Sequence, residues 1–177
     1  MPSPADFGFT DEKLLTHPTV YASDLFKGRR GLGSGARSGL GKAAAAPFGR
    51  AGAGLGGGGG QPQKPAEAVD FLRRTGATVH SGVLNIREAE NVAAFMDRAF
   101  GEWGGVDVLI NNAGGQFAQP AIDFTVKGWN AVVDTNLNGT WYMMQAAAQA
   151  WVGRRRPGVI ANAVAGFWRG MPGIAHT

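Results

Sequence analysis

Amide side chains follow a short apolar run in the second half of the chain, in a pattern that suits nucleotide binding. The run from Val106 to Ile110 predicts a buried strand, and it leads directly into Asn111, Asn112, Ala113 and Gly114. The carboxyl edge of a parallel sheet is where open α/β proteins bind nucleotides. Gly114 has no Cβ and would let the backbone approach a ligand closely. We therefore expect these four residues to line a nucleotide site.

A glycine-rich turn before an alanine-rich helix is the second candidate. It comprises Ser34, Gly35, Ala36, Arg37, Ser38, Gly39, Leu40 and Gly41. A dinucleotide pyrophosphate needs exposed backbone N–H groups at a helix N-terminus, with no Cβ in the way. The spacing Gly-x-x-x-Gly-x-Gly meets that need, whereas Lys42 is followed by alanine and not by the Ser or Thr of a Walker A loop. The alternative is a flexible linker, because the whole segment is rich in glycine.

The charges near this turn favour NADP(H) over NAD(H). NAD-binding folds commonly place Asp or Glu after the second strand to hold the ribose hydroxyls, and NADP binders use Arg there. No acidic residue lies between Gly52 and Ala66, and Arg37 lies inside the glycine turn with Lys42 nearby. We expect Arg37 to meet the 2′-phosphate of NADP(H). The alternative is that Arg37 is a solvated loop charge.

The elements that would position these residues alternate along the chain. Strands are expected at 29–33, 53–59, 78–84, 106–110 and 158–164, and helices at 39–50, 65–75, 87–103 and 128–151. This alternation predicts right-handed crossovers and a doubly wound α/β fold with a parallel sheet. Residues 1–26 are expected to form an irregular arm. Glycine propensity alone predicts that 53–59 is a flexible loop.

Asn136 lies on the apolar stripe of the expected helix 128–151. The stripe consists of Val132, Val133, Asn136, Thr140, Met143, Ala147 and Trp151, which recur near helical spacing. A polar amide on such a stripe needs hydrogen-bonding partners. One interpretation is a core asparagine satisfied by backbone groups, and the other is a functional residue.

Composition narrows the function classes. The chain has 177 residues, a formal net charge of +4 and no cysteine, so disulfides and thiolate chemistry are excluded. With only His17, His80 and His176, we expect no metal site. No apolar run approaches the roughly 20 residues of a membrane span, and the acidic N-terminus does not fit a signal peptide. We expect a cytoplasmic protein that acts on a small molecule and binds neither membranes nor nucleic acid.

Together, the 34–41 turn, the Asn-Asn-Ala-Gly loop and Asn136 resemble the short-chain dehydrogenase/reductase family. The resemblance covers roughly residues 27–177 and implies a partial Rossmann-type domain. It implies that Asn136 is catalytic, bending its helix and holding a water in a proton relay. Relatives often hold the adenine amino group with Asp where Asn85-Ile86 stands, so Asn85 could do the same, or it could be a plain strand-end residue. Ser34 replaces the family's usual threonine and keeps the hydroxyl.

One part of the family pattern is missing from this sequence. The family supplies its proton with Tyr-x-x-x-Lys, but neither Tyr21 nor Tyr142 is followed by lysine four residues later. The family's serine after the fifth strand is also absent from 162–166. The resemblance is strongest to a subgroup that includes peroxisomal-type trans-2-enoyl-CoA reductases and citronellol dehydrogenase-like proteins. Residues 170–177 resemble the substrate-loop segment of this subgroup. We therefore expect a domain that is incomplete at its C-terminus.

Two kinds of function follow from these expectations. The first is NADP(H)-dependent oxidoreduction of an alcohol/ketone pair or an enoyl thioester, by a form lacking the Tyr-x-x-x-Lys segment. The second is no catalysis at all, either in a nucleotide-binding remnant or in a non-functional fragment whose glycine-filled strands do not form. A homo-oligomer is typical of the family but is doubtful for this chain, because the resemblance implies that a helix of the usual subunit interface is missing. Its loss would expose apolar surface on helix 128–151, which is a candidate for association or aggregation.

Overall fold

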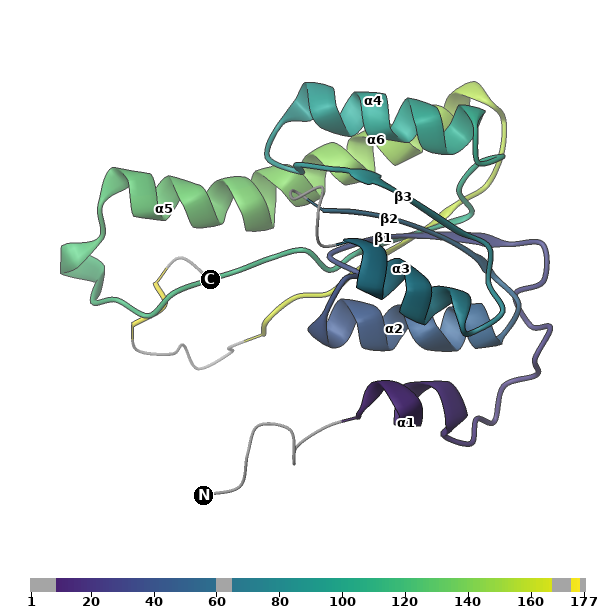
Figure 1. Cartoon of the computed structure of the whole chain (residues 1–177). Coiled ribbons are helices and arrows are strands. Elements are labelled where there is room, and N and C mark those ends of the chain that lie inside the picture. The colour runs from purple at the N-terminus through teal and green to yellow at the C-terminus, as the bar shows by residue number, and fades with distance from the viewer. Residues whose placement is uncertain (1–8, 60–64, 167–172, 176–177) are drawn as a thin grey trace, which may run out of the picture.

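A five-stranded parallel sheet is the centre of the computed structural model, which describes residues 9–59, 65–166 and 173–175 (Figure 1). Its strands are β1 (Arg30–Ser34), β2 (Gly54–Gly59), β3 (Val79–Val83), β4 (Val108–Asn111) and β5 (Val159–Asn162). They lie in the order β3-β2-β1-β4-β5, and every neighbouring pair is parallel. The strand order reverses between β1 and β4, as in a doubly wound fold. The expected fold class is confirmed.

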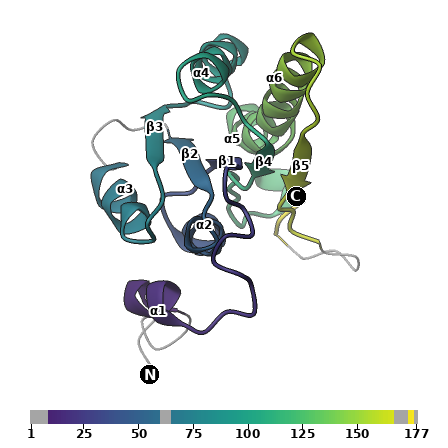
Figure 2. The same cartoon turned by 90° about the vertical axis from the view of Figure 1, so that its right-hand side faces the viewer.

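Helices cover both faces of the sheet (Figure 2). On one face lie α2 (Gly39–Arg50) and α3 (Pro65–Arg73), and on the other lie α4 (Ala89–Gly101) and α6 (Thr140–Gly153). Two hydrophobic cores follow from these layers. The α2–α3 side buries Ala46, Ala53, Leu55, Phe71, Leu72 and Ala77, and the α4–α6 side buries a larger group around Leu32, Phe95, Leu109, Met143 and Trp151. The five strands and four helices expected from the sequence are present, with ends that differ by a few residues.

The glycine-rich segment forms a strand, so the loop predicted from propensity alone is wrong. Strand β2 pairs with β1 over residues 54–58 and with β3 over residues 55–59. A Cβ built on Gly58 would lie 2.4 Å from Leu84 Cβ, and one on Gly56 would lie 3.1 Å from Trp103 Cζ3. Neighbouring side chains therefore occupy the space above these two glycines, and pairing on both edges outweighs the low strand propensity of glycine.

A single helical run, expected at 128–151, extends from α5 (Val126–Val133) through a π-helical turn at Asp134–Gly139 into α6. Thr125 caps its start, with Oγ1 accepting the Gly128 N–H at 3.0 Å. Of the expected stripe, Val132, Met143, Ala147 and Trp151 are buried, while the remaining three residues are partly exposed. The Trp151 indole N–H donates to the Val106 carbonyl at 2.6 Å and ties α6 to the residues before β4. π-Turns inside α-helices are frequent at functional sites.

Of the irregular arm expected for residues 1–26, the structure describes residues 9–26, and these include a short helix. Helix α1 (Asp11–Thr16) is capped by Thr10, whose Oγ1 accepts the Lys13 N–H at 3.3 Å. An ion pair joins Asp11 to Lys42 at the start of α2. Arg50 donates to the carbonyls of Leu14 and His17 at 3.1 and 2.7 Å. The sequence pattern Thr-Asp-Glu-Lys, a cap followed by acidic residues, could have predicted this helix.

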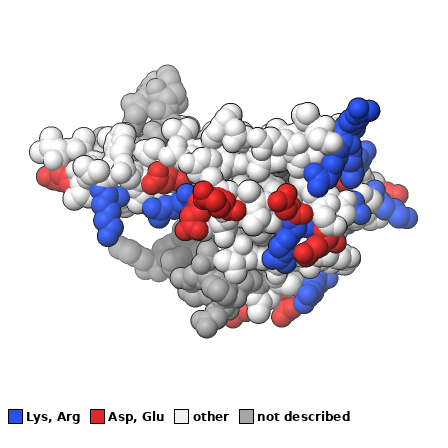
Figure 3. Space-filling view, turned by 90° about the horizontal axis from the view of Figure 1, so that it is seen from above, with Lys and Arg blue, Asp and Glu red and all other residues white. Residues whose placement is uncertain are grey.

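Apolar side chains are exposed on β5 and on the α5–α6 helix. All four residues of β5 are exposed, and Leu137, Trp141 and Val152 are 66%, 52% and 78% exposed. Much of the surface seen in Figure 3 is uncharged. The exposure expected for this helix is therefore observed. Within the described residues, no helix is long and apolar enough to cross a membrane, and no cluster of metal-binding side chains occurs.

Candidate cofactor-binding site

The two candidate loops meet at the point where the strand order reverses. Strands β1 and β4 are neighbours, with Gly33 paired to Ile110, so the glycine turn after β1 lies beside the asparagine loop after β4. Open α/β sheets bind ligands in the crevice outside this point. The structure thus brings together segments that lie more than 70 residues apart in the sequence.

Ser34 and Asn112 join the two loops. The Ser34 hydroxyl is buried and accepts the backbone N–H groups of Asn112 and Ala113, both at 3.1 Å. In the opposite direction, Asn112 Nδ2 donates to the carbonyls of Ser34 and Gly35 at 3.4 Å. Both side chains therefore hold the shape of the turn, and a hydroxyl at position 34 is what this geometry requires.

Gly41 is the glycine on which the turn depends most. A Cβ there would lie 2.3 Å from the Gly35 carbonyl oxygen and 2.5 Å from Asn112 Nδ2. Gly35 has φ +69° and a Cβ on it would lie 3.1 Å from the Ala113 Cα, so it needs glycine for conformation and for space. Gly39 has φ +52° and faces open space, with no atom of the described residues within 4 Å of its Cβ position. Gly35 and Gly41 pack the turn, and Gly39 leaves its outer surface open.

Among the described residues, the N-terminus of α2 lacks a side-chain cap. Ser38 is the N-cap residue, but its side chain makes no capping hydrogen bond. The first N–H groups of a helix have no partner within the helix, and they carry the positive end of its dipole. Leu40 is 81% exposed beside them. This arrangement fits the pyrophosphate of a dinucleotide, which such helix ends bind through backbone N–H groups.

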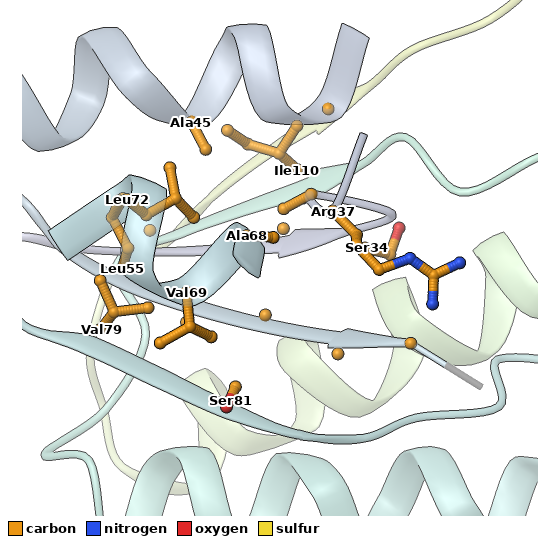
Figure 4. Close-up of a pocket in the computed structure, with 18 of the residues that line it drawn as sticks. Ser34, Arg37, Ala45, Leu55, Ala68, Val69, Leu72, Val79, Ser81 and Ile110 are labelled. Carbon is orange, nitrogen blue, oxygen red and sulfur yellow. The ribbon is translucent and has the colours of Figure 1, made fainter. Parts of the chain in front are cut away.

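Arg37 extends from the turn over the end of β2. A Cβ on Gly59 would lie 3.8 Å from Arg37 Nη1, so the guanidinium lies above the last residue of this strand. Figure 4 shows Arg37 and Ser34 at one end of an apolar pocket between the sheet and α2–α3. In the part of the chain that the structure describes, Arg37 has no carboxylate partner. Its charge is thus available where the adenosine ribose of a dinucleotide would lie.

The Asn111 side chain connects two strands of the sheet. Its Nδ2 donates to Asn162 Oδ1 at 2.9 Å, and Asn162 Nδ2 lies 3.4 Å from Met144 Sδ. The Asn111 side chain is buried, and its Oδ1 has no hydrogen-bonding partner among the described residues. These contacts connect β4 to β5 below the loop, which is the strand-tying role that amides commonly have at such positions.

Asn85 and Ile86 have local contacts. Asn85 Oδ1 accepts the Arg87 N–H at 3.2 Å, and its Nδ2 donates to Glu88 Oε1 at 2.6 Å. The carbonyl that the sequence suggested for the adenine amino group is therefore engaged in a turn that starts α4. Ile86 is buried, and a Cβ on Gly139 would lie 2.8 Å from its Cγ1, so it packs against the π-turn.

Asn136 lies in the π-turn and is bound to the loop after β4. Its Oδ1 accepts the Gly115 N–H and its Nδ2 donates to the Gly115 carbonyl, both at 3.0 Å. A Cβ on Gly114 would lie 3.2 Å from Asn136 Oδ1, so this glycine allows the close approach. The Asn136 amide thus bonds to backbone groups, as one of our two interpretations expects. It also lies beside the proposed nucleotide site, as the functional interpretation requires.

Replacing Asn136 with alanine should loosen the loop after β4. The variant loses both hydrogen bonds to Gly115, which should lower the free energy of unfolding by about 1–2 kcal/mol. Amide hydrogen exchange at Gly115 should accelerate more than exchange in β1. Asn138→Ala removes only a bond to Asp134 Oδ1 within the same turn and is the matched control. Equal exchange at Gly115 in both variants would contradict this role of Asn136.

Sequence reasoning did not identify Gly115, Asn91 or Glu88. Gly115 is the backbone partner of Asn136, and Asn91 Oδ1 accepts the Asn85 N–H at 2.8 Å. The pair Gly114-Gly115 was a signal for close backbone approach, since two adjacent glycines suit a tight loop. Of the segment 170–177, expected to resemble a substrate loop, all but 173–175 lies outside the described residues. Gly173 accepts the Gln119 N–H at 2.7 Å.

Comparison with known proteins identifies the family. Residues 32–171 match the short chain dehydrogenase family. The chain belongs to this family. The expected resemblance is therefore confirmed, and the matched range includes both loops and Asn136.

Individual relatives agree with this assignment. A Bacillus subtilis (strain 168) protein named "Probable 2,4-dienoyl-CoA reductase [(2E)-enoyl-CoA-producing]" is 37% identical over 95 residues, which make up 53% of this chain and 37% of that protein. The citronellol catabolism dehydrogenase AtuB of Pseudomonas aeruginosa PAO1 has a TM-score of 0.82 at 28% identity, covering 89% of this chain and 64% of AtuB. A short chain dehydrogenase from Bacillus anthracis str. 'Ames Ancestor' has a TM-score of 0.81 at 32% identity, with 85% and 61% covered. The chain thus aligns with less than two-thirds of each of these three relatives.

Proposed function

We propose that this chain binds NADP(H) at the carboxyl edge of the sheet. We further propose that it is part of an oxidoreductase that acts on an enoyl thioester or an alcohol/ketone pair. The observation that carries the proposal is the N-terminus of α2, which has no side-chain cap from Ser38, together with Arg37 above the end of β2, which has no carboxylate partner among the described residues. The substrate classes rest on the printed names of the dienoyl-CoA reductase and the citronellol catabolism dehydrogenase.

Each part of the site would have a separate task. The first N–H groups of α2 would bind the pyrophosphate, and Gly39 leaves them accessible. Arg37 would pair with the 2′-phosphate, because a guanidinium forms a bidentate contact with phosphate oxygens. Gly114 lies beside Asn136 and would allow the loop after β4 to approach the nucleotide. The bound nicotinamide supplies the hydride chemistry, and the protein orients it.

Replacing Arg37 with glutamine tests the preference for the phosphorylated cofactor. The variant loses a charged hydrogen-bonding group, so NADP+ should bind about tenfold or more weakly, while NAD+ affinity should change little. Calorimetric titration of both cofactors against both proteins measures the difference. Arg73→Gln, an exposed α3 arginine already paired with Asp70 at 3.3 Å, is the control. Equal losses for NAD+ and NADP+ would contradict the proposed role.

The proton donor distinguishes catalysis from binding alone. Hydride transfer to a carbonyl needs a proton source beside the reacting atom. Tyr142 packs against the α4–α6 core and Tyr21 is exposed near the N-terminus. Asn136 would position a water beside the nicotinamide but cannot replace the phenol as a donor. We infer that this sequence by itself binds cofactor with little or no turnover, and that it is cytoplasmic.

Hydrogen exchange and calorimetry separate this proposal from a non-functional fragment, and the activity of a longer chain separates it from a nucleotide-binding remnant. A nucleotide-binding remnant would bind NADP(H) by calorimetry but show no cofactor oxidation with an enoyl-CoA or ketone panel. A non-functional fragment would exchange its amides rapidly across 29–60, where the structure has β1, α2 and β2 in place. Slow exchange there together with saturable NADP(H) binding is the expected result. If a longer chain carrying Tyr-x-x-x-Lys also lacked activity, the oxidoreductase proposal would fail.

A further inference from the structure

We propose that the amino edge of the sheet contains a second ligand site, which takes an oxyanion attached to a flat ring. A pocket of about 300 Å³ lies at the starts of β1 and β2, against Arg30, Gly54, Gly56, His80 and Trp103. Arg30 is the first residue of β1, whereas the cofactor loops follow its last residue, Ser34. The two sites are therefore at opposite edges of the sheet, and this proposal does not rest on the function proposed above.

Glycines form the floor of this pocket. Gly54 and Gly56 lie in β2 beside Arg30 and Leu32 of β1. A Cβ on Gly54 would lie 3.6 Å from Arg30 Cγ, and one on Gly56 would lie 3.0 Å from Leu32 Cδ1. The β2 backbone is thus open to the pocket at Gly54, where a flat group can lie against it, whereas Leu32 and the Trp103 ring already cover Gly56.

Arg30 provides an uncompensated positive charge. The residue is partly buried, and its guanidinium lies against Gly104, where a Cβ would be 2.9 Å from Nη2. The nearby Asp107 carboxylate already accepts the Arg30 backbone N–H at 2.8 Å and Arg156 Nη2 at 3.2 Å. It also lies 3.7 Å from Arg29 Nη1. Among the described residues, no carboxylate pairs with the Arg30 guanidinium.

This imbalance selects an anionic ligand. A partly buried cation without a counter-ion loses hydration and gains no hydrogen bond in return. A bound oxyanion would supply the missing hydrogen bonds. Guanidinium groups match phosphate and carboxylate oxygens in a bidentate manner. With Asp107 shared between Arg29 and Arg156, the local charge at this edge is positive. The pocket therefore favours an oxyanion over a neutral or cationic group.

Aromatic rings form the opposite wall. The rings of His80 and Trp103 stack with centroids 5.2 Å apart and an interplanar angle of 13°. Phe95 meets Trp103 edge-on at 5.3 Å and 86°, which holds the indole in place. A planar ring on the ligand would pack against the edges or the outer face of this stacked pair, because aromatic groups prefer offset-stacked or edge-to-face contacts. An aryl phosphate or aryl carboxylate combines both properties.

Titration of the whole chain with phenyl phosphate, followed by NMR of ¹⁵N-labelled protein, tests the site. The Trp103 indole N–H and the Gly54 amide should shift and saturate. Arg30→Gln should weaken binding about tenfold or more, the loss expected for one charged hydrogen-bonding group. Gly54→Ala should also weaken binding, because the new Cβ fills the floor of the pocket. The fold should stay intact, since that Cβ makes only ordinary contacts, the nearest at 3.6 Å. Arg98→Gln, which removes an α4 arginine already paired with Glu102 at 3.5 Å, should have no effect.

Two further titrations distinguish the sources of binding. Benzoate should bind at the same residues and with the same dependence on Arg30. Inorganic phosphate should bind more weakly than phenyl phosphate, and equal affinity would overturn the requirement for a ring and indicate an adventitious ion only. If affinity instead falls in Arg37→Gln and not in Arg30→Gln, the anion binds at the cofactor edge and the proposed site does not exist.

Discussion

Replacing Gly41 with alanine should abolish measurable NADP(H) binding. The new Cβ would lie 2.3 Å from the Gly35 carbonyl oxygen and 2.5 Å from Asn112 Nδ2, and both atoms belong to the packed turn. The backbone of the turn must move away from α2, which displaces the N–H groups that would bind the pyrophosphate. A misplacement of about 1 Å costs roughly a hundredfold in rate where reacting groups are concerned, and we expect cofactor affinity to fall by at least as much. Overpacking should also lower the free energy of unfolding by about 1–3 kcal/mol.

The matched control is Gly101→Ala at the end of α4. Gly101 is also helical, but apart from its chain neighbours and the backbone of its own helix, no atom of the described residues lies within 4 Å of its Cβ position. Alanine there should leave cofactor binding unchanged and should not reduce stability, because alanine is the better helix former. Calorimetry at a temperature where circular dichroism shows all variants folded separates lost binding from lost structure. Normal NADP+ affinity in the Gly41 variant would mean that the turn is not the phosphate site.

Alanine at Gly58 and alanine at Gly59 should have opposite effects on stability. A Cβ on Gly58 would lie 2.4 Å from Leu84 Cβ and 2.9 Å from Phe95 Cε2, in the packed α4 side of the sheet. We expect a loss of about 1–3 kcal/mol in the free energy of unfolding from this overlap. A Cβ on Gly59 points to the other face, and its nearest neighbour, Arg37 Nη1, is 3.8 Å away. That variant should gain about 0.5–1 kcal/mol, because alanine restricts the unfolded chain more than glycine does.

Chemical denaturation of both variants measures this difference between adjacent residues. The comparison is sharp because the substitution is the same and both residues lie in β2, so strand propensity affects both alike. Equal destabilisation would mean that β2 does not present its glycines alternately to the two faces. Equal stabilisation would mean that the segment is a loop, as glycine propensity alone predicts.

The fold could be predicted from the sequence wherever the pattern of apolar residues was regular. Helix α4 and strand β4 follow from apolar spacing and from the bounding glycines at 104 and 105. Strand β2 could not be predicted from its own residues, since it is held by pairing with β1 and β3 and by side chains from α4. Helix α1 has a capping signal in Thr10 and the acidic residues after it, but its six residues bury no side chain fully, so the sequence shows no apolar stripe there. Its contacts with Arg50, Lys42 and Arg74 depend on the fold.

The candidate site was predictable in its location but only partly in its contacts. Glycine spacing indicated the turn, and strand alternation placed it beside Asn112. The use of each amide was not predictable, because Asn85, Asn111 and Asn136 find partners in segments whose positions depend on the tertiary fold. A single sequence indicates that an amide needs partners, but it does not show which backbone group will lie within reach.

Titration of the ¹⁵N-labelled chain with NADP+ tests the central claim most directly. We predict saturable shifts of the Gly35, Gly39 and Gly41 amides and of the Asn112 to Gly114 amides, with little change at Gly54 on the opposite edge. Shifts confined to the amino edge, or no saturable shift in a protein whose β1 and β2 amides are protected from exchange, would contradict a dinucleotide site at the junction of β1 and β4.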